Sequence, residues 1–103
     1  MVRARLRMIL SEEDYNRLVI SEPAPGQIRI TADVHGMKCY EASRLIKNII
    51  ILVNSDFTFV VIHGYNHGTA IKDMLAQNFK NSHVREQYQD YYNKGLTRML
   101  IAA

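Results

Sequence analysis

Residues 56–62 read DFTFVVI, and this run constrains the fold more than any other part of the chain. β-branched and aromatic side chains favour strands, and a strand with hardly a polar atom is typical of the centre of a sheet, covered on both faces. A glycine-containing loop, residues 63–68, follows, and apolar residues then recur at helical spacing as far as Phe79. A buried strand that leads into a helix predicts an α/β domain.

The segments on either side of this strand extend the same pattern. Residues 27–34 alternate apolar and polar side chains as a half-covered strand does, and residues 39–54 carry apolar side chains at helical spacing with a wide buried face. A strand, a helix and a second strand predict a parallel pair with a right-handed crossover. Weaker strands over 83–89 and 96–101, with a turn at 93–95, would add antiparallel partners. The expectation is a βαβαββ two-layer sandwich whose mixed sheet has a mainly parallel core.

The first 27 residues are expected to form an N-terminal extension, and residues 28–103 the domain proper. Residues 2–10 alternate basic and apolar side chains, which predicts a strand at a sheet edge. Ser11 followed by three acids is a helix-start signal, so a short helix is expected to run to about Leu18. Residues 21–26 (SEPAPG) should break it, because neither proline fits a helix interior.

Composition limits the class of protein. The chain has 103 residues, enough for about one domain, with 48% hydrophobic and 22% charged residues. The single cysteine, Cys39, excludes an internal disulfide and fits a reducing compartment, so a cytoplasmic location is expected. The longest apolar run, residues 49–53, falls far short of the roughly 20 residues of a membrane span, so no membrane partner is expected. A net charge of +3 permits contact with phosphates without requiring it. The sequence leaves the oligomeric state open.

Polar residues and glycines gather where the two predicted parallel strands end, which is where open α/β sheets bind ligands. Asp33 and His35 are two apart on a strand, so both side chains should point the same way. A carboxylate there can orient an imidazole, fix its tautomer and raise its basicity. His63 ends the next strand, and the N–H groups of residues 68–70 at the following helix start should favour an anion such as phosphate.

Three motifs in order resemble the Smr (small MutS-related) domain family over residues 28–102. Residues 33–42 (DVHGMKCYEA) resemble its L-D-x-H-G-x-x-x-x-E-A signature, residues 63–68 (HGYNHG) its H-G-x-G-x-G loop, and residues 95–100 (GLTRML) its closing G-x-T-x-x-L. The chain departs from these patterns at three positions. Ala32 replaces a leucine, Tyr65 stands where a basic residue is common, and Asn66 replaces a glycine, although Asn tolerates a positive φ best among the other residues.

The resemblance implies a fold akin to the C-terminal domain of translation initiation factor 3 and nicking or endonuclease activity on DNA or RNA. It implies catalytic roles for Asp33, His35 and His63. The candidate nucleic-acid-binding residues are those of the loop, Gly64, Tyr65, Asn66, His67 and Gly68, joined by the basic side chains of Arg3, Arg5, Arg7 and Lys38. The motifs neither require nor exclude a divalent cation such as magnesium, and no metal ligand is assigned.

Simpler interpretations stay open for each of these residues. His35 could cap a backbone carbonyl, and Asp33 could only stabilise the turn before Gly36. The domain could bind nucleic acid without chemistry, or could be a protein-interaction module on the same fold. The tyrosines near the C-terminus could stack on unpaired bases or cover the hairpin. They are Tyr88, Tyr91 and Tyr92.

Overall fold

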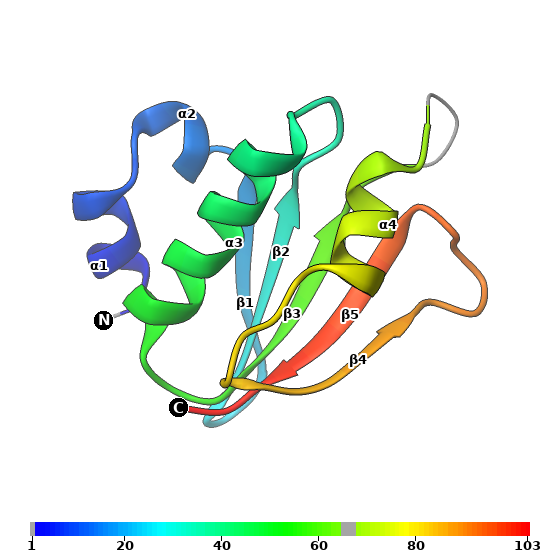
Figure 1. Cartoon of the computed structure of the whole chain (residues 1–103). Helices are drawn as coiled ribbons and strands as arrows, with labels where there is room; N and C mark the ends of the chain where they lie inside the picture. The colour runs from blue at the N-terminus through cyan, green and yellow to red at the C-terminus, as the bar shows by residue number, and fades with distance from the viewer. Residues whose placement is uncertain (1, 65–67) are drawn as a thin grey trace.

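The computed structural model describes residues 2–64 and 68–103 as a mixed five-stranded sheet with four helices (Figure 1). The helices are α1 (Val2–Ile9), α2 (Glu12–Tyr15), α3 (Cys39–Val53) and α4 (Ala70–Gln77). The strands are β1 (Leu18–Ala24), β2 (Gln27–Asp33), β3 (Phe57–Ile62), β4 (Val84–Gln89) and β5 (Leu96–Ile101). From β2 onward this is the predicted βαβαββ order.

The strands lie in the order β1-β2-β3-β5-β4. β2 and β3 are parallel, with Ile30 opposite Phe59, which confirms the predicted parallel pair. β5 runs antiparallel to both β3 and β4, as expected for a terminal hairpin. The expectation of a mainly parallel core was wrong, because β1 also pairs antiparallel with β2. Only one of the four described pairings is parallel, because β2 and β3 are the only adjacent strands joined by a helix; α4 joins β3 to β4, and β5 lies between those two strands.

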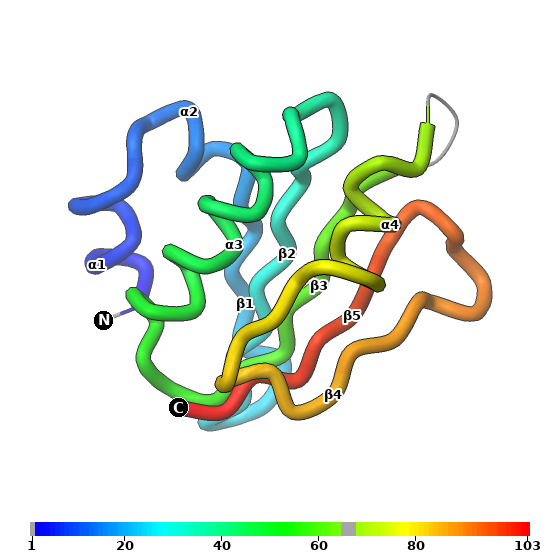
Figure 2. Tube along the Cα trace, viewed as in Figure 1, coloured from blue at the N-terminus to red at the C-terminus, as the bar shows by residue number. Residues whose placement is uncertain are grey.

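The helices cover one face of the sheet, so the molecule has two layers (Figure 2). β3 is the central strand as predicted, but helices cover only one of its faces. Phe57, Phe59 and Val61 belong to the core between sheet and helices. Val60 points to the other face and is still only 6% exposed. Its neighbours across the strands are Thr31 and Arg98, whose side chains share this face of the sheet. The unbroken apolar run therefore reflects a central position without a second helical layer.

The N-terminal segment is a helix, so the predicted strand over residues 2–10 was wrong. Val2 and Leu6 lie four residues apart on one face of α1, and Leu10, directly after the helix, donates its N–H to the Leu6 carbonyl at 2.9 Å. Leu6 is fully buried in the core, and α1 packs against α3. The period-two alternation of so short a segment fits a strand and a helix alike, and contact with α3 decides between them.

β1 replaces the helix end and linker expected over residues 18–26. The helix-start signal is confirmed, because the Ser11 Oγ accepts a hydrogen bond from the Asp14 N–H at 3.1 Å, but α2 ends at Tyr15. β1 is an edge strand, where Pro23 costs no ladder hydrogen bond on its open side. The turn between Ala24 and Gln27 uses the φ of +78° that Gly26 adopts readily. Residues 2–27 thus belong to the same sheet and core as the rest.

The two sheet edges share an irregularity. In β1 the register shifts between Ser21 and Ala24, and in β4 it shifts between Val84 and Glu86.

The longest described helix, α3, has 15 residues, and no helix of residues 2–64 and 68–103 has the length and hydropathy to cross a membrane.

Candidate active site

A cleft of about 590 Å³ opens where β2 and β3 end. Four segments line it: residues 35–37 after β2, residues 62–64 at the end of β3, Gly68, Ala70 and Ile71 at the start of α4, and Asn93 and Gly95 before β5. His35 and His63 therefore share one crevice, as the parallel arrangement predicted. The cleft lies at the carboxyl ends of the parallel strands, the usual ligand position in an open α/β sheet.

His35 lines this cleft and forms a side-chain pair with Asp33 at the end of β2. The Asp33 Oδ1 contacts the His35 Nδ1 closely. An ionised carboxylate only accepts hydrogen bonds, so the Nδ1 of a neutral His35 ring carries the proton and the Nε2 keeps its lone pair. The side chains of His35 and Asp33 are 68% and 43% exposed, which leaves the pair open to a large substrate. This is the arrangement of an oriented general base.

The structure also fits one of the simpler interpretations. The same Asp33 oxygen accepts a hydrogen bond from the His35 N–H at 3.2 Å, so Asp33 stabilises the turn as well as orienting the ring. Gly36 continues this turn with a φ of +80°. Within the described residues, the His35 ring makes no hydrogen bond to a backbone carbonyl. The carbonyl-capping interpretation of His35 therefore has no support.

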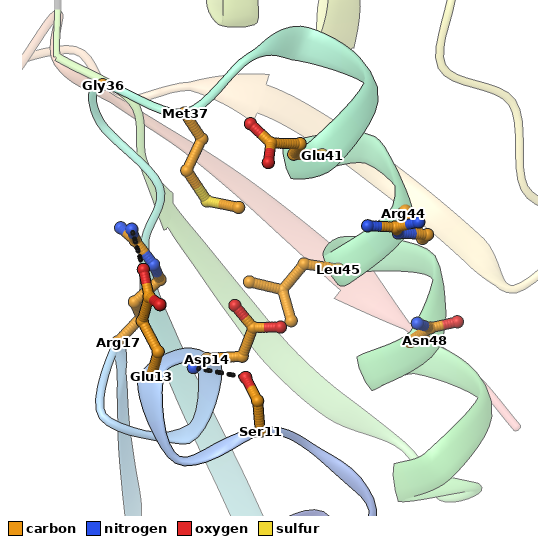
Figure 3. Close-up of a pocket in the computed structure, with 10 residues that line it drawn as sticks. All are labelled: Ser11, Glu13, Asp14, Arg17, Gly36, Met37, Glu41, Arg44, Leu45 and Asn48. Carbon is orange, nitrogen blue, oxygen red and sulfur yellow. Dashed lines mark hydrogen bonds and ion pairs between the residues drawn. The ribbon is translucent and has the colours of Figure 1, made fainter.

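Arg17 fixes the backbone that carries the pair, and the sequence offered no signal for it beyond its spacing from Glu13. The Asp33 N–H donates to the Arg17 carbonyl at 2.9 Å, and the Arg17 Nη1 donates to the Asp33 carbonyl at 3.2 Å. Figure 3 shows the Arg17 side chain beside Glu13, an ion pair of 3.7 Å, at a polar pocket of about 350 Å³ between α2 and α3. The N-terminal segment thus reaches the end of β2 directly.

His63 lies in the cleft wall, and both of its ring nitrogens are already paired. It is only 6% exposed. The Nδ1–H donates to the Gly64 carbonyl at 2.8 Å, and the Nε2 pairs with the Thr97 hydroxyl, also at 2.8 Å. With the proton on Nδ1, the Thr97 hydroxyl donates to Nε2. The His63 ring therefore has no free nitrogen to offer a substrate, whereas the His35 Nε2 has no partner within the described part of the chain.

The three sequence motifs meet at this point of the structure. The N–H groups of His63 and Gly64 both donate to the Gly95 carbonyl at 2.9 Å, and Thr97 lies against the His63 ring. Gly64 has a φ of +72°, and a Cβ there would lie 3.6 Å from the His35 Cβ. The closing motif, residues 95–100, is thus hydrogen-bonded to His63 and Gly64 of the second motif, and Gly64 lies next to His35 of the first. The sequence did not reveal this pairing, because Thr97 is 34 residues from His63.

The loop after His63 is described only at its ends. The candidates Tyr65, Asn66 and His67 lie outside the described residues. Gly68 borders the cleft with a φ of +120°, and α4 begins directly after Thr69, as predicted. The Thr69 hydroxyl donates to the Asp73 carboxylate at 2.8 Å, so it does not cap the helix, and no other described side chain does so. Among the residues that the structure describes, the first N–H groups of α4 therefore have no side-chain acceptor, which suits them to an external one.

The basic candidates of the N-terminus lie away from the cleft. Arg3, Arg5 and Arg7 are on α1, which packs beside α3 (Figure 1), and a helix does not align them in the single stripe that a strand would. Arg3 and Arg5 donate to backbone carbonyls, Arg5 to Leu52 at 3.0 Å, and Arg7 lies over an aromatic ring. Lys38 is different, because it is exposed and follows the cleft residue Met37 directly.

Two further residues of the first motif have structural contacts. Glu41 accepts a hydrogen bond from the Lys38 N–H at 3.2 Å, which caps the start of α3. Cys39 is half-buried against the core, as a packing residue would be. Among residues 2–64 and 68–103, no three or more His, Cys, Asp or Glu side chains are grouped as metal ligands. Asp33, His35 and His63 are therefore not gathered into a metal site there.

The chain gives no match to a protein-family model, a curated protein or a solved structure. The resemblance to the Smr family accordingly rests on its three motifs.

Proposed function

We propose that this chain is an Smr-like endonuclease that cleaves a phosphodiester bond of DNA or RNA in the cleft between His35 and Gly68. The proposal also includes a fold akin to the C-terminal domain of translation initiation factor 3, since the resemblance of the three motifs implies this fold as well as the activity. The observation that carries it is the exposed Asp33–His35 pair at a cleft bordered by the start of α4. Within residues 2–64 and 68–103, neither the His35 Nε2 nor the first N–H groups of α4 have a side-chain partner.

In this proposal His35 acts as the general base. Its Nε2 takes the proton of the attacking group, a water or the substrate's own 2′-hydroxyl, as the new O–P bond forms. The bond to the leaving oxygen breaks, and that oxygen takes a proton from water while the imidazolium returns its own proton to the solvent. Asp33 holds the Nδ1–H and stabilises the imidazolium that results. The N–H groups at the start of α4 receive the phosphate oxygens. His63 supports the cleft, because both its nitrogens are engaged within the protein.

The test is incubation of the purified protein with labelled single-stranded and double-stranded DNA and RNA, with and without magnesium. We expect cleavage of at least one substrate, and His35→Ala should lower its rate by about 10²–10⁴-fold, the usual contribution of a general base. Asp33→Asn should act in the same direction more weakly, because the imidazole remains. His83→Ala is the matched control, since His83 is an exposed histidine just before β4 whose ring contacts the Ala102 carbonyl, away from the cleft residues.

Two outcomes would contradict the proposed endonuclease activity of this cleft. Cleavage that survives unchanged in His35→Ala would come from another site or another protein. Binding without cleavage under any condition would instead establish a non-catalytic nucleic-acid-binding module on the same cleft.

A further inference from the structure

The connection between β4 and β5, residues 90–95, carries the two most exposed aromatic side chains of the described residues. Tyr91 and Tyr92 are 88% and 92% exposed. Their rings contact each other edge to face with centroids 5.0 Å apart, and this contact favours one relative orientation of the two rings. Two large side chains that bury almost nothing contribute little to the core, which leaves their faces open to an outside partner.

Hydrogen bonds fix this connection next to the candidate cleft. The Gly95 N–H donates to the Asn93 Oδ1 at 2.9 Å, and the Asp90 N–H donates to the Leu96 carbonyl at 3.3 Å. The Asp90 carboxylate also pairs with the Arg98 Nε at 3.2 Å. Asn93 and Gly95 are themselves cleft residues. The tyrosine pair is therefore adjacent in the chain to one wall of the cleft, on a connection held at both ends.

The cleft has an apolar interior that a phosphate does not need. Met37, Ile62 and Ile71 line it together with glycines, and among the described lining residues the ionisable side chains are His35 and His63. A volume of about 590 Å³ lies within the usual range of small-ligand sites. An apolar cleft beside a hydrogen-bonding pair suits a flat, partly apolar group attached to a phosphate. A nucleobase is such a group.

We infer that Tyr91 and Tyr92 stack on unpaired bases and that the cleft receives one such base, so that the ligand is a single-stranded nucleic acid. Bases in a duplex already cover one another's faces, and only unpaired bases can stack on exposed rings. The charge suits this ligand, because Lys94 is exposed on the same connection and the chain carries a net +3. The inference rests on the proposed function for the cleft's contact with phosphate, but it concerns binding alone.

Binding is measured by fluorescence anisotropy with the full chain, in EDTA, so that the result does not depend on magnesium-supported cleavage. The probes are labelled single strands of DNA and of RNA with one sequence, the matching duplexes, and a strand of abasic deoxyribose phosphates. We expect either single strand to bind more tightly than its duplex and than the abasic strand. A preference for the RNA strand over the DNA strand would add that the 2′-hydroxyl is contacted, with the stacking intact.

The double variant Tyr91→Ala/Tyr92→Ala should weaken single-strand binding by at least about 5-fold, the lower range for loss of a base–aromatic stack. Tyr91→Phe/Tyr92→Phe should bind nearly as well as the natural chain, because the rings remain. Met8→Ala is the matched control, since it removes an equally exposed apolar side chain (82%) on α1. Circular dichroism should show that all variants stay folded.

Equal binding of the single, duplex and abasic strands would overturn the inference, as would an unchanged affinity of the double alanine variant or a chain that binds no oligonucleotide. Tyrosine-dependent binding of single strands without any cleavage would support the inference and contradict the endonuclease. His35-dependent cleavage of duplexes, unaffected by the tyrosines, would support the endonuclease and overturn the inference.

Discussion

Replacing Thr97 by Val tests whether the pairing of Thr97 with His63 holds the cleft together. Valine has nearly the shape of threonine but lacks the hydroxyl, so the change removes one hydrogen bond with little effect on packing. Thr97 is 2% exposed and His63 is 6% exposed, so water cannot readily replace the lost group. The Nε2 of His63 would stay buried without its partner, 2.8 Å away in the natural chain.

An unsatisfied buried acceptor costs about 1–3 kcal/mol, which is the expected loss in the free energy of unfolding. A loss of 1 kcal/mol lowers the melting temperature of a domain of this size by about 4–8 °C. Thr97→Val should therefore melt at least about 4 °C below the natural chain. Combined with His63→Leu, it should cost less than the sum of the two single changes, because neither partner is then left unpaired.

The assays are urea unfolding and thermal melting, both followed by far-ultraviolet circular dichroism, since the chain has no tryptophan. Thr58→Val is the matched control: Thr58 lies on β3, the strand that pairs with β5, but its side chain points to the face that no helix covers and makes no hydrogen bond among the described residues. Its effect should stay within about 0.5 kcal/mol. If Thr97→Val destabilised the chain no more than Thr58→Val does, the pairing with His63 would not stabilise the fold.

Three further predictions follow from the N-terminal segment. Leu6→Ala should cost about 2–5 kcal/mol in urea unfolding, because Leu6 is fully buried in the core, and an effect below 1 kcal/mol would show that α1 is dispensable. Arg17→Ala should lower kcat for cleavage more than it raises KM, with partial rescue by Arg17→Lys, because it frees the Asp33 carbonyl; a change in KM alone would contradict this. Replacing Arg3, Arg5 and Arg7 together by Gln should leave the salt dependence of nucleic-acid affinity unchanged, whereas a flatter slope would place phosphates on α1.

The part of the fold that the sequence predicted is the part whose signals are local. The run from Phe57 to Ile62, the helical spacing over residues 39–54 and the crossover rule together lead to the parallel pair of β2 and β3. The end of that pair then predicts where His35 and His63 meet. Both histidines do border one cleft.

The N-terminal elements were mispredicted because their choice depends on distant partners. Val2 and Leu6 fit a strand by period two and a helix by period four, and only α3 offers a surface for the helix. Pro23 read as a break, although an edge strand tolerates it. The site shows the same limit. The pairing of His63 with Thr97 and the hold of Arg17 on Asp33 exist only once the sheet has formed, so no spacing in the sequence reveals them.

The register shifts in the two edge strands, β1 and β4, bear on how readily the chain aggregates at high protein concentration. A straight, unpaired strand edge is a template on which another chain can add a strand, the first step of many aggregates. β1 has a register shift and a proline without an N–H donor, and β4 has a shift near its start. Neither edge therefore presents an unbroken row of donors and acceptors to a neighbouring molecule. One face of the sheet has no helices over it, and the irregular edge strands β1 and β4 hinder the addition of strands from other molecules to this sheet.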